Sequence, residues 1–138
     1  MRRRLYSGAG ARVSFNEAML RVTSLLFATV VAHAYHARVA SYHHLFLAVT
    51  VLSVLFHATK DRRVGIVDKF VAHCGFVFVL GDSQRAARSG QGWLLIYPWT
   101  VLCLWFAQSW LPARAERLHA CLHCVAVVGL HCFLFWLY

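Results

Sequence analysis

The stretch Ser53–Phe70, SVLFHATKDRRVGIVDKF, decides the fold of this chain. It closes one apolar run, crosses a basic segment and opens the next apolar run. Each run approaches the roughly 20 residues that an α-helix needs to cross a bilayer. Apolar helices joined by short basic segments are typical of polytopic membrane proteins, in which positive charge gathers on one side. The stretch therefore predicts the end of one membrane helix, a turn, and the start of the next.

The composition of the whole chain agrees with this prediction. Of its 138 residues, 60% are hydrophobic and only 14% are charged, against roughly 25% charged in ordinary soluble domains. We expect an all-α polytopic transmembrane bundle of about five helices over residues 17–138, preceded by a basic N-terminal segment, residues 1–16. The expected spans are Glu17–Tyr35, Tyr42–Thr59, Val64–Gly81, Trp93–Leu111 and Ala115–Tyr138. The segment DSQRAARSGQG, residues 82–92, is expected to be a polar loop.

The basic residues indicate an orientation rather than a nucleic-acid partner. Most of the net charge of +9 lies between the apolar runs, and no basic face is interleaved with aromatic residues, which excludes nucleic-acid binding. If the five spans alternate, the side of the N-terminus carries eleven Lys and Arg and the other side three. The side of the N-terminus holds Arg2, Arg3, Arg4, Arg12, Arg21, Lys60, Arg62, Arg63, Lys69, Arg114 and Arg117; the other side holds Arg38, Arg85 and Arg88. The positive-inside rule then predicts a cytosolic N-terminus.

The N-terminal segment is compatible with more than one organelle as the location of the protein. It is rich in arginine, has no acidic residue up to residue 14, and suits either a basic membrane-flanking segment or a mitochondrial presequence. We expect an integral multi-pass protein of the endomembrane system, ER or Golgi, with a mitochondrial membrane as the alternative.

Polar side chains recur at one end of the expected helices. Ser53 and His57 are four residues apart, as are His119 and His123 in HACLH, so each pair lies on one helical face. Alternating spans place these residues and Asp68 at the same membrane face. Two histidines at this spacing can chelate one metal ion. A third ligand with an open fourth position is the pattern of catalytic zinc, which lowers the pKa of a bound water to roughly 7.

Each of these residues also has a simpler interpretation. A histidine at a helix end is often interfacial, Asp68 suits a helix N-terminus, and Ser53 can hydrogen-bond within its own helix. Ionisable groups inside spans are costly, however, and tend to be functional. The remaining histidines fall into two sets. Those at the opposite face suit a solvated cluster or a second metal site: His33, His36, His43 and His44. His73 and His131 lie deeper in the spans as lone residues, and we expect both to be packed and hydrogen-bonded.

The five polar residues resemble the motif of the CREST superfamily, which groups alkaline ceramidases, adiponectin/progestin receptors and related multi-pass membrane proteins. Its pattern is a serine and a histidine four apart, an aspartate early in the next helix, and a late HxxxH. Here Ser53, His57, Asp68, His119 and His123 match that order and spacing. The resemblance implies that the three histidines hold Zn²⁺, that Asp68 activates the attacking water, and that Ser53 positions this water or stabilises an oxyanion.

The resemblance also implies a function. We expect a zinc-dependent hydrolase of a lipid amide or ester, with a ceramide-like or other acyl lipid as the membrane substrate. Alternatives are a non-catalytic, zinc-stabilised receptor or scaffold, and a haem-binding electron carrier with His57 and His119 as axial ligands. Members of the superfamily usually have seven helices, and five are counted here. A homo-oligomer or a wide lateral opening would compensate for the missing walls of the lipid cavity.

Overall fold

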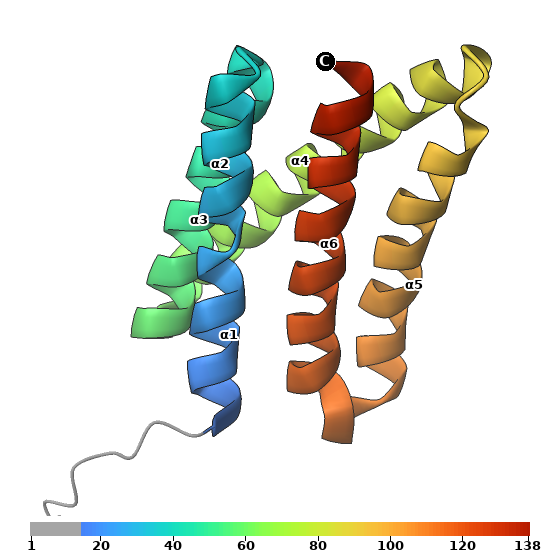
Figure 1. The fold of residues 1–138 in the computed structure, drawn as a ribbon. Coiled ribbons are helices and arrows are strands. Elements are labelled where there is room, and N and C mark those ends of the chain that lie inside the picture. The colour runs from blue at the N-terminus through green and yellow to red at the C-terminus, as the bar shows by residue number, and fades with distance from the viewer. Residues whose placement is uncertain (1–14) are drawn as a thin grey trace, which may run out of the picture.

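The computed structural model describes residues 15–138 and is an all-α bundle (Figure 1). Its α-helices are α1 (Phe15–Leu25), α2 (Phe27–His36), α3 (Ala40–Thr59), α4 (Arg62–Arg88), α5 (Ile96–Trp110) and α6 (Ala115–Leu137). Two short 3₁₀-helices, η1 (Gly92–Leu95) and η2 (Pro112–Arg114), precede α5 and α6. The described part contains no strand, so the predicted fold class is confirmed.

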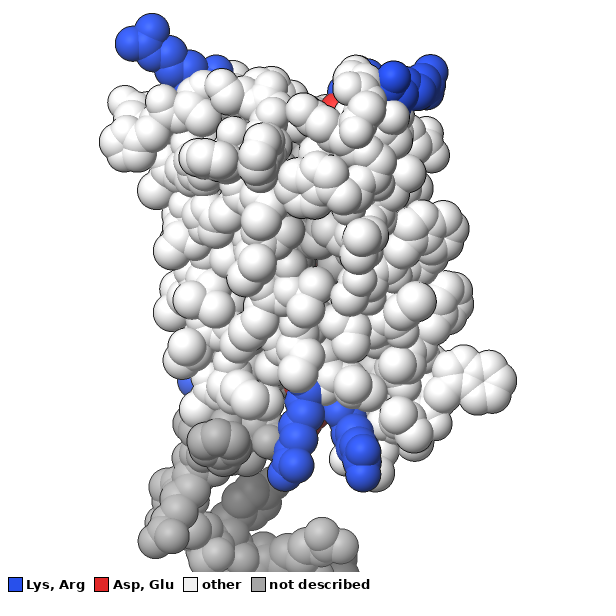
Figure 2. All heavy atoms as spheres, turned by 45° about the vertical axis from the view of Figure 1, so that its right-hand side comes forward, with Lys and Arg blue, Asp and Glu red and all other residues white. Residues whose placement is uncertain are grey.

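Four helical stretches are long and apolar enough to cross a membrane: Glu17–His36, Ala40–Thr59, Arg62–Arg88 and Pro112–Leu137. The fifth expected span is shorter, since α5 has 15 residues. At about 1.5 Å per residue for α5 and about 2 Å for η1, the two together still reach roughly the 30 Å of a bilayer core. Figure 2 shows Lys and Arg at the two ends of the face in view, with an uncharged band between them. The chain is an integral membrane protein.

The first expected helix is interrupted, because α1 and α2 meet at Leu26. The amide of Leu26 is 3.3 Å from the carbonyl oxygens of both Val22 and Thr23, which are long hydrogen bonds. Hydroxyl groups on either side compete for backbone carbonyls. Thr23 donates to Leu20 O at 3.2 Å, and Thr29 donates to Leu26 O at 2.6 Å. Such back-bonding by Ser and Thr loosens a helix, which explains the break.

The helices are arranged so that α1 and α2 lie between α3 and α6, while α5 pairs with α6. Helix α4 runs obliquely behind the others, packs along α3 and reaches η1 (Figure 1). Two glycines of α4 show the register of the antiparallel pair α3 and α4. A Cβ added at Gly65 would clash with the ring of Phe56, whereas one added at Gly75 would make ordinary contacts with Leu45 and Phe46, at 3.9 Å. Gly65 and Gly75 of α4 thus lie opposite Phe56 and Phe46 of α3, so the two helices pair residue by residue in opposite directions. The same register places Asp68 level with Ser53.

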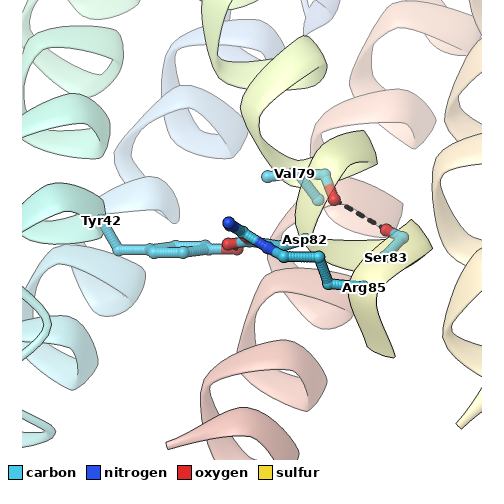
Figure 3. A network of polar contacts seen from close by, with 5 residues as sticks. All are labelled: Tyr42, Val79, Asp82, Ser83 and Arg85. Atoms are coloured by element: carbon cyan, nitrogen blue, oxygen red, sulfur yellow. Dashed lines mark hydrogen bonds and ion pairs between the residues drawn. The ribbon is translucent and has the colours of Figure 1, made fainter. Parts of the chain in front are cut away.

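The segment expected as a polar loop is mostly helical, and this prediction was wrong. Helix α4 continues to Arg88, and only residues 89–91 connect it to η1. Its polar side chains find partners inside the bundle (Figure 3): Tyr42 Oη donates to Asp82 Oδ2 at 2.8 Å, and the Arg85 guanidinium donates to Oδ1 of the same carboxylate. Ser83 donates to Val79 O at 2.7 Å. Because Asp82 and Ser83 are hydrogen-bonded, they can be buried without ending the helix, while Arg85 stays exposed.

Candidate metal centre

Three imidazoles meet at the end of the bundle where α1, α4 and α6 begin and α3 ends, at the bottom of Figure 1. His57 lies in the last turn of α3, and His119 and His123 lie in the first turns of α6. Their ring centroids are 5.6, 5.9 and 4.6 Å apart, and each ring offers one nitrogen within 4.8 Å of the other two. The three histidines can therefore form a metal site, and they are the one such group found within residues 15–138.

Hydrogen bonds orient the two histidines of α6. His119 Nδ1 is 3.1 Å from Gln108 Oε1 of α5, and His123 Nδ1 is 3.2 Å from Thr23 Oγ1 of α1. Both oxygens accept, since the Gln108 oxygen has no proton and the Thr23 hydroxyl donates to Leu20 O. The proton of each imidazole is thus on Nδ1, and Nε2 carries the free lone pair. A partner of this kind fixes the tautomer and ring orientation of a metal-binding histidine.

His57 supplies the observation that points most directly to a ligand. Its side chain is only 4% exposed, and neither ring nitrogen has a hydrogen-bond partner. Leaving a buried polar group unpaired costs about 1–3 kcal/mol, so the arrangement needs a compensating interaction. Nitrogens bound to one tetrahedral zinc ion at 2.0–2.1 Å are roughly 3.4 Å apart. Because the three nitrogens lie within 4.8 Å of one another, they need to approach by at most about 1.4 Å to hold such an ion. The donor set fits a small metal ion.

Ser53 is connected to the centre through a chain of hydroxyl groups. Its buried Oγ is 3.1 Å from Ser24 Oγ, which in turn is 3.5 Å from His123 Nδ1. Ser24 donates its own proton to Leu20 O at 2.8 Å, so Ser53 is the donor to Ser24. The lone pairs of Ser53 stay available as acceptors. In this state Ser53 can accept a hydrogen bond from a water or a substrate group, but its own proton is already donated to Ser24.

Asp68 is buried at the same end of the bundle, level with Ser53, but its carboxylate is not among the ligand atoms that converge with those of the three histidines. It makes no hydrogen bond or ion pair with another described residue. The predicted contact between this carboxylate and a metal-bound water therefore stays a prediction.

Sequence reasoning missed the residues that support the histidines. Thr23, Ser24 and Gln108 were not predicted to belong to the site, and neither was Arg21, whose Nε donates to His57 O at 3.3 Å. The available signal was their polarity inside apolar spans, which is typical of functional positions. Their pairing with particular histidines depends on three helices meeting, and spacing along one helix does not show that.

The other histidines differ in part from expectation. His131 is hydrogen-bonded as expected but is not alone, because its Nδ1 is 2.8 Å from His33 Nδ1 and its Nε2 is 2.9 Å from Thr29 Oγ1. His33 is therefore half-buried against α6 rather than part of a solvated cluster. His73 is hydrogen-bonded as expected, with Nδ1 2.5 Å from Lys69 O, but it is exposed on α4, where its ring makes a T-shaped contact with Trp105, so its expected packing was wrong.

Comparisons of the chain with protein-family models, with curated proteins and with solved structures gave no match. The function must therefore be inferred from the side chains at this centre.

Proposed function

We propose that the protein is an integral-membrane, zinc-dependent hydrolase of a lipid amide or ester, and that it is a reduced member of the CREST superfamily. The observation that carries this proposal is the convergence of three imidazoles, one of them buried with both nitrogens unpaired. Three nitrogen ligands and an open position are the usual set of catalytic zinc. The rings form one compact cluster rather than a facing pair, which favours a small ion over the flat porphyrin of a haem.

Zinc at this centre would supply Lewis acidity and lower the pKa of a bound water to roughly 7. The chain supplies the rest of the chemistry. Asp68, the buried carboxylate among those at this end of the bundle, takes the proton of the attacking water. It then returns that proton to the amine or alcohol that leaves when the acyl carbon–nitrogen or carbon–oxygen bond breaks. Ser53 accepts a hydrogen bond from the attacking water and so helps to hold it in place.

The charge distribution supports a cytosolic position for the site. Within residues 15–138 the metal-centre end carries seven Lys and Arg, and the opposite end carries three. The seven are Arg21, Lys60, Arg62, Arg63, Lys69, Arg114 and Arg117; the three are Arg38, Arg85 and Arg88. Four further arginines counted toward this side lie outside the described residues. By the positive-inside rule the metal-centre end faces the cytosol, where a lipid can enter laterally from the inner leaflet.

The metal content tests this proposal. The protein is purified in detergent and its zinc measured by mass spectrometry, with His119→Ala as the variant and His73→Ala, an exposed histidine outside the centre, as the control. We expect about one zinc per wild-type chain, the same in the control, and a large loss in His119→Ala. A wild-type content below about a tenth of an ion per chain, unchanged by His119→Ala, would refute the proposal, given how tightly structural and catalytic zinc bind.

A second candidate is a zinc-stabilised receptor or scaffold without catalysis. It is favoured by the position of Asp68, which makes no hydrogen bond to the three histidines and is not one of the converging metal-ligand groups. Asp68→Asn separates the two candidates. In a hydrolase this variant keeps its zinc and loses turnover of fluorescent ceramide or acyl-ester lipids. In a scaffold, the wild type shows no turnover, removal of zinc lowers the melting temperature, and Asp68→Asn changes neither property.

A further inference from the structure

The turn between α2 and α3 lies at the end of the bundle opposite the metal centre (Figure 1). The residues of this turn and of the adjoining helix ends line a groove. We call it the α2–α3 groove. Its volume is about 620 Å³, and its polar lining comprises Tyr35, His36, Arg38, His43 and His44. No acidic residue is among the described residues that line it. Both adjoining spans end at this turn, so the groove lies at the depth of the lipid headgroups. It combines one permanent positive charge with three imidazoles.

Two of these imidazoles have a defined tautomer. His43 Nδ1 is 3.2 Å from Val31 O, and His44 Nδ1 is 2.8 Å from Ala40 O. A carbonyl oxygen only accepts, so Nδ1 is protonated in both rings and Nε2 is left without a hydrogen bond to any described residue. These histidines do not form a group of three metal ligands, since within residues 15–138 that geometry occurs only at His57, His119 and His123. Their free nitrogens suit a ligand that shares a proton.

The backbone adds donors to the same groove. Val39 and Ala40 line it where α3 begins, and no side chain caps this helix end. The Val39 amide already donates to Ala34 O at 2.9 Å, so the unpaired amides of this helix end begin at Ala40, which lines the groove, with the positive end of the helix dipole behind it. Arg38 follows the C-terminal end of α2, two residues before α3 begins, and is in the left-handed conformation, with φ of 59°. Glycine is the usual residue at this position of a helix end, so the arginine side chain is held there against a backbone preference.

We propose that the α2–α3 groove binds a phosphomonoester, the headgroup of a phosphatidic-acid-type lipid or a soluble phosphate. Arg38 and the amides of α3 bind the charged oxygens. A phosphomonoester also shares one proton with an imidazole Nε2: either the phosphate or the ring carries it, and the hydrogen bond is the same. A phosphodiester has fewer free oxygens and no proton of this kind, so it binds more weakly. This site is independent of the proposed hydrolase, because it lies at the other end of the bundle.

The test compares two anionic lipids on the purified full-length protein. Binding of phosphatidic acid, a monoester, and phosphatidylglycerol, a diester, is measured by native mass spectrometry or by lipid titration in nanodiscs. We expect a preference for phosphatidic acid of about tenfold or more, the effect of a hydrogen-bonded charge. Arg38→Ala and Arg38→Gly should abolish it. Arg88→Gln removes an exposed charge from the same end, outside the groove, and should keep it.

Arg38→Gly also separates binding from folding. Glycine relieves the left-handed backbone, so this variant should melt at the wild-type temperature or above it while losing the lipid preference. Displacement of phosphatidic acid by excess inorganic phosphate would identify a soluble phosphate as a ligand, and lack of displacement would assign the groove to the lipid. Equal binding of the two lipids, a preference retained in Arg38→Ala, or an equal loss in Arg88→Gln would overturn the proposal.

Discussion

Replacing Gln108 tests whether the hydrogen bond to His119 prepares the metal centre. Gln108→Leu keeps a side chain of similar size and removes the oxygen that lies 3.1 Å from His119 Nδ1. The imidazole then loses the partner that fixes its tautomer and direction. Loss of such a supporting partner typically lowers metal affinity by about 10–100-fold. That range corresponds to roughly 1.4–2.7 kcal/mol of binding free energy.

A second substitution at the same position is expected not to lower the zinc affinity, which makes this prediction specific. Gln108→Glu keeps an acceptor and makes it anionic, so it should hold or raise the zinc affinity, since a carboxylate increases the basicity of the bound histidine. Affinity is measured by competition with a chromogenic zinc chelator in detergent. Gln84→Leu removes an exposed glutamine at the other end of the bundle and serves as the control. Wild-type affinity in Gln108→Leu, or equal losses in the Leu and Glu variants, would refute the reasoning.

Two further predictions concern the packing of the bundle. Gly129→Ala places a methyl group inside the ring of Tyr97 and should destabilise the protein by about 1–3 kcal/mol. The control is Gly81→Ala, whose added methyl group meets no atom within 4 Å and should leave the stability unchanged. Thermal melting in detergent measures both variants, and equal shifts in melting temperature would contradict the prediction. Tyr42→Phe removes the hydroxyl that donates to the buried carboxylate of Asp82 at 2.8 Å, and should cost about 1–3 kcal/mol in denaturant-induced unfolding. An unchanged stability would mean that water replaces the hydroxyl.

The sequence predicted most of the helical framework, because apolar length and basic turns are local properties. It placed the turn after Thr59, with α4 beginning two residues earlier than expected. It failed where polar residues are buried. Asp82 and Ser83 indicated a loop, yet they lie in α4, because Tyr42 and a backbone carbonyl satisfy them. Those partners come from a distant helix or from the helical backbone itself, and composition does not reveal them.

The sequence by itself also determined the order and spacing of the histidines, since residues four apart share a helical face. That His57 and His119 approach each other was an expectation from alternating spans, and only the tertiary structure brought their rings to 5.6 Å. The partners that hydrogen-bond the histidines were also determined only by the tertiary structure. Gln108 faces His119 because α5 and α6 pack antiparallel in one register. Periodicity determines which side of a helix a residue occupies, but contacts between helices depend on how their surfaces pack.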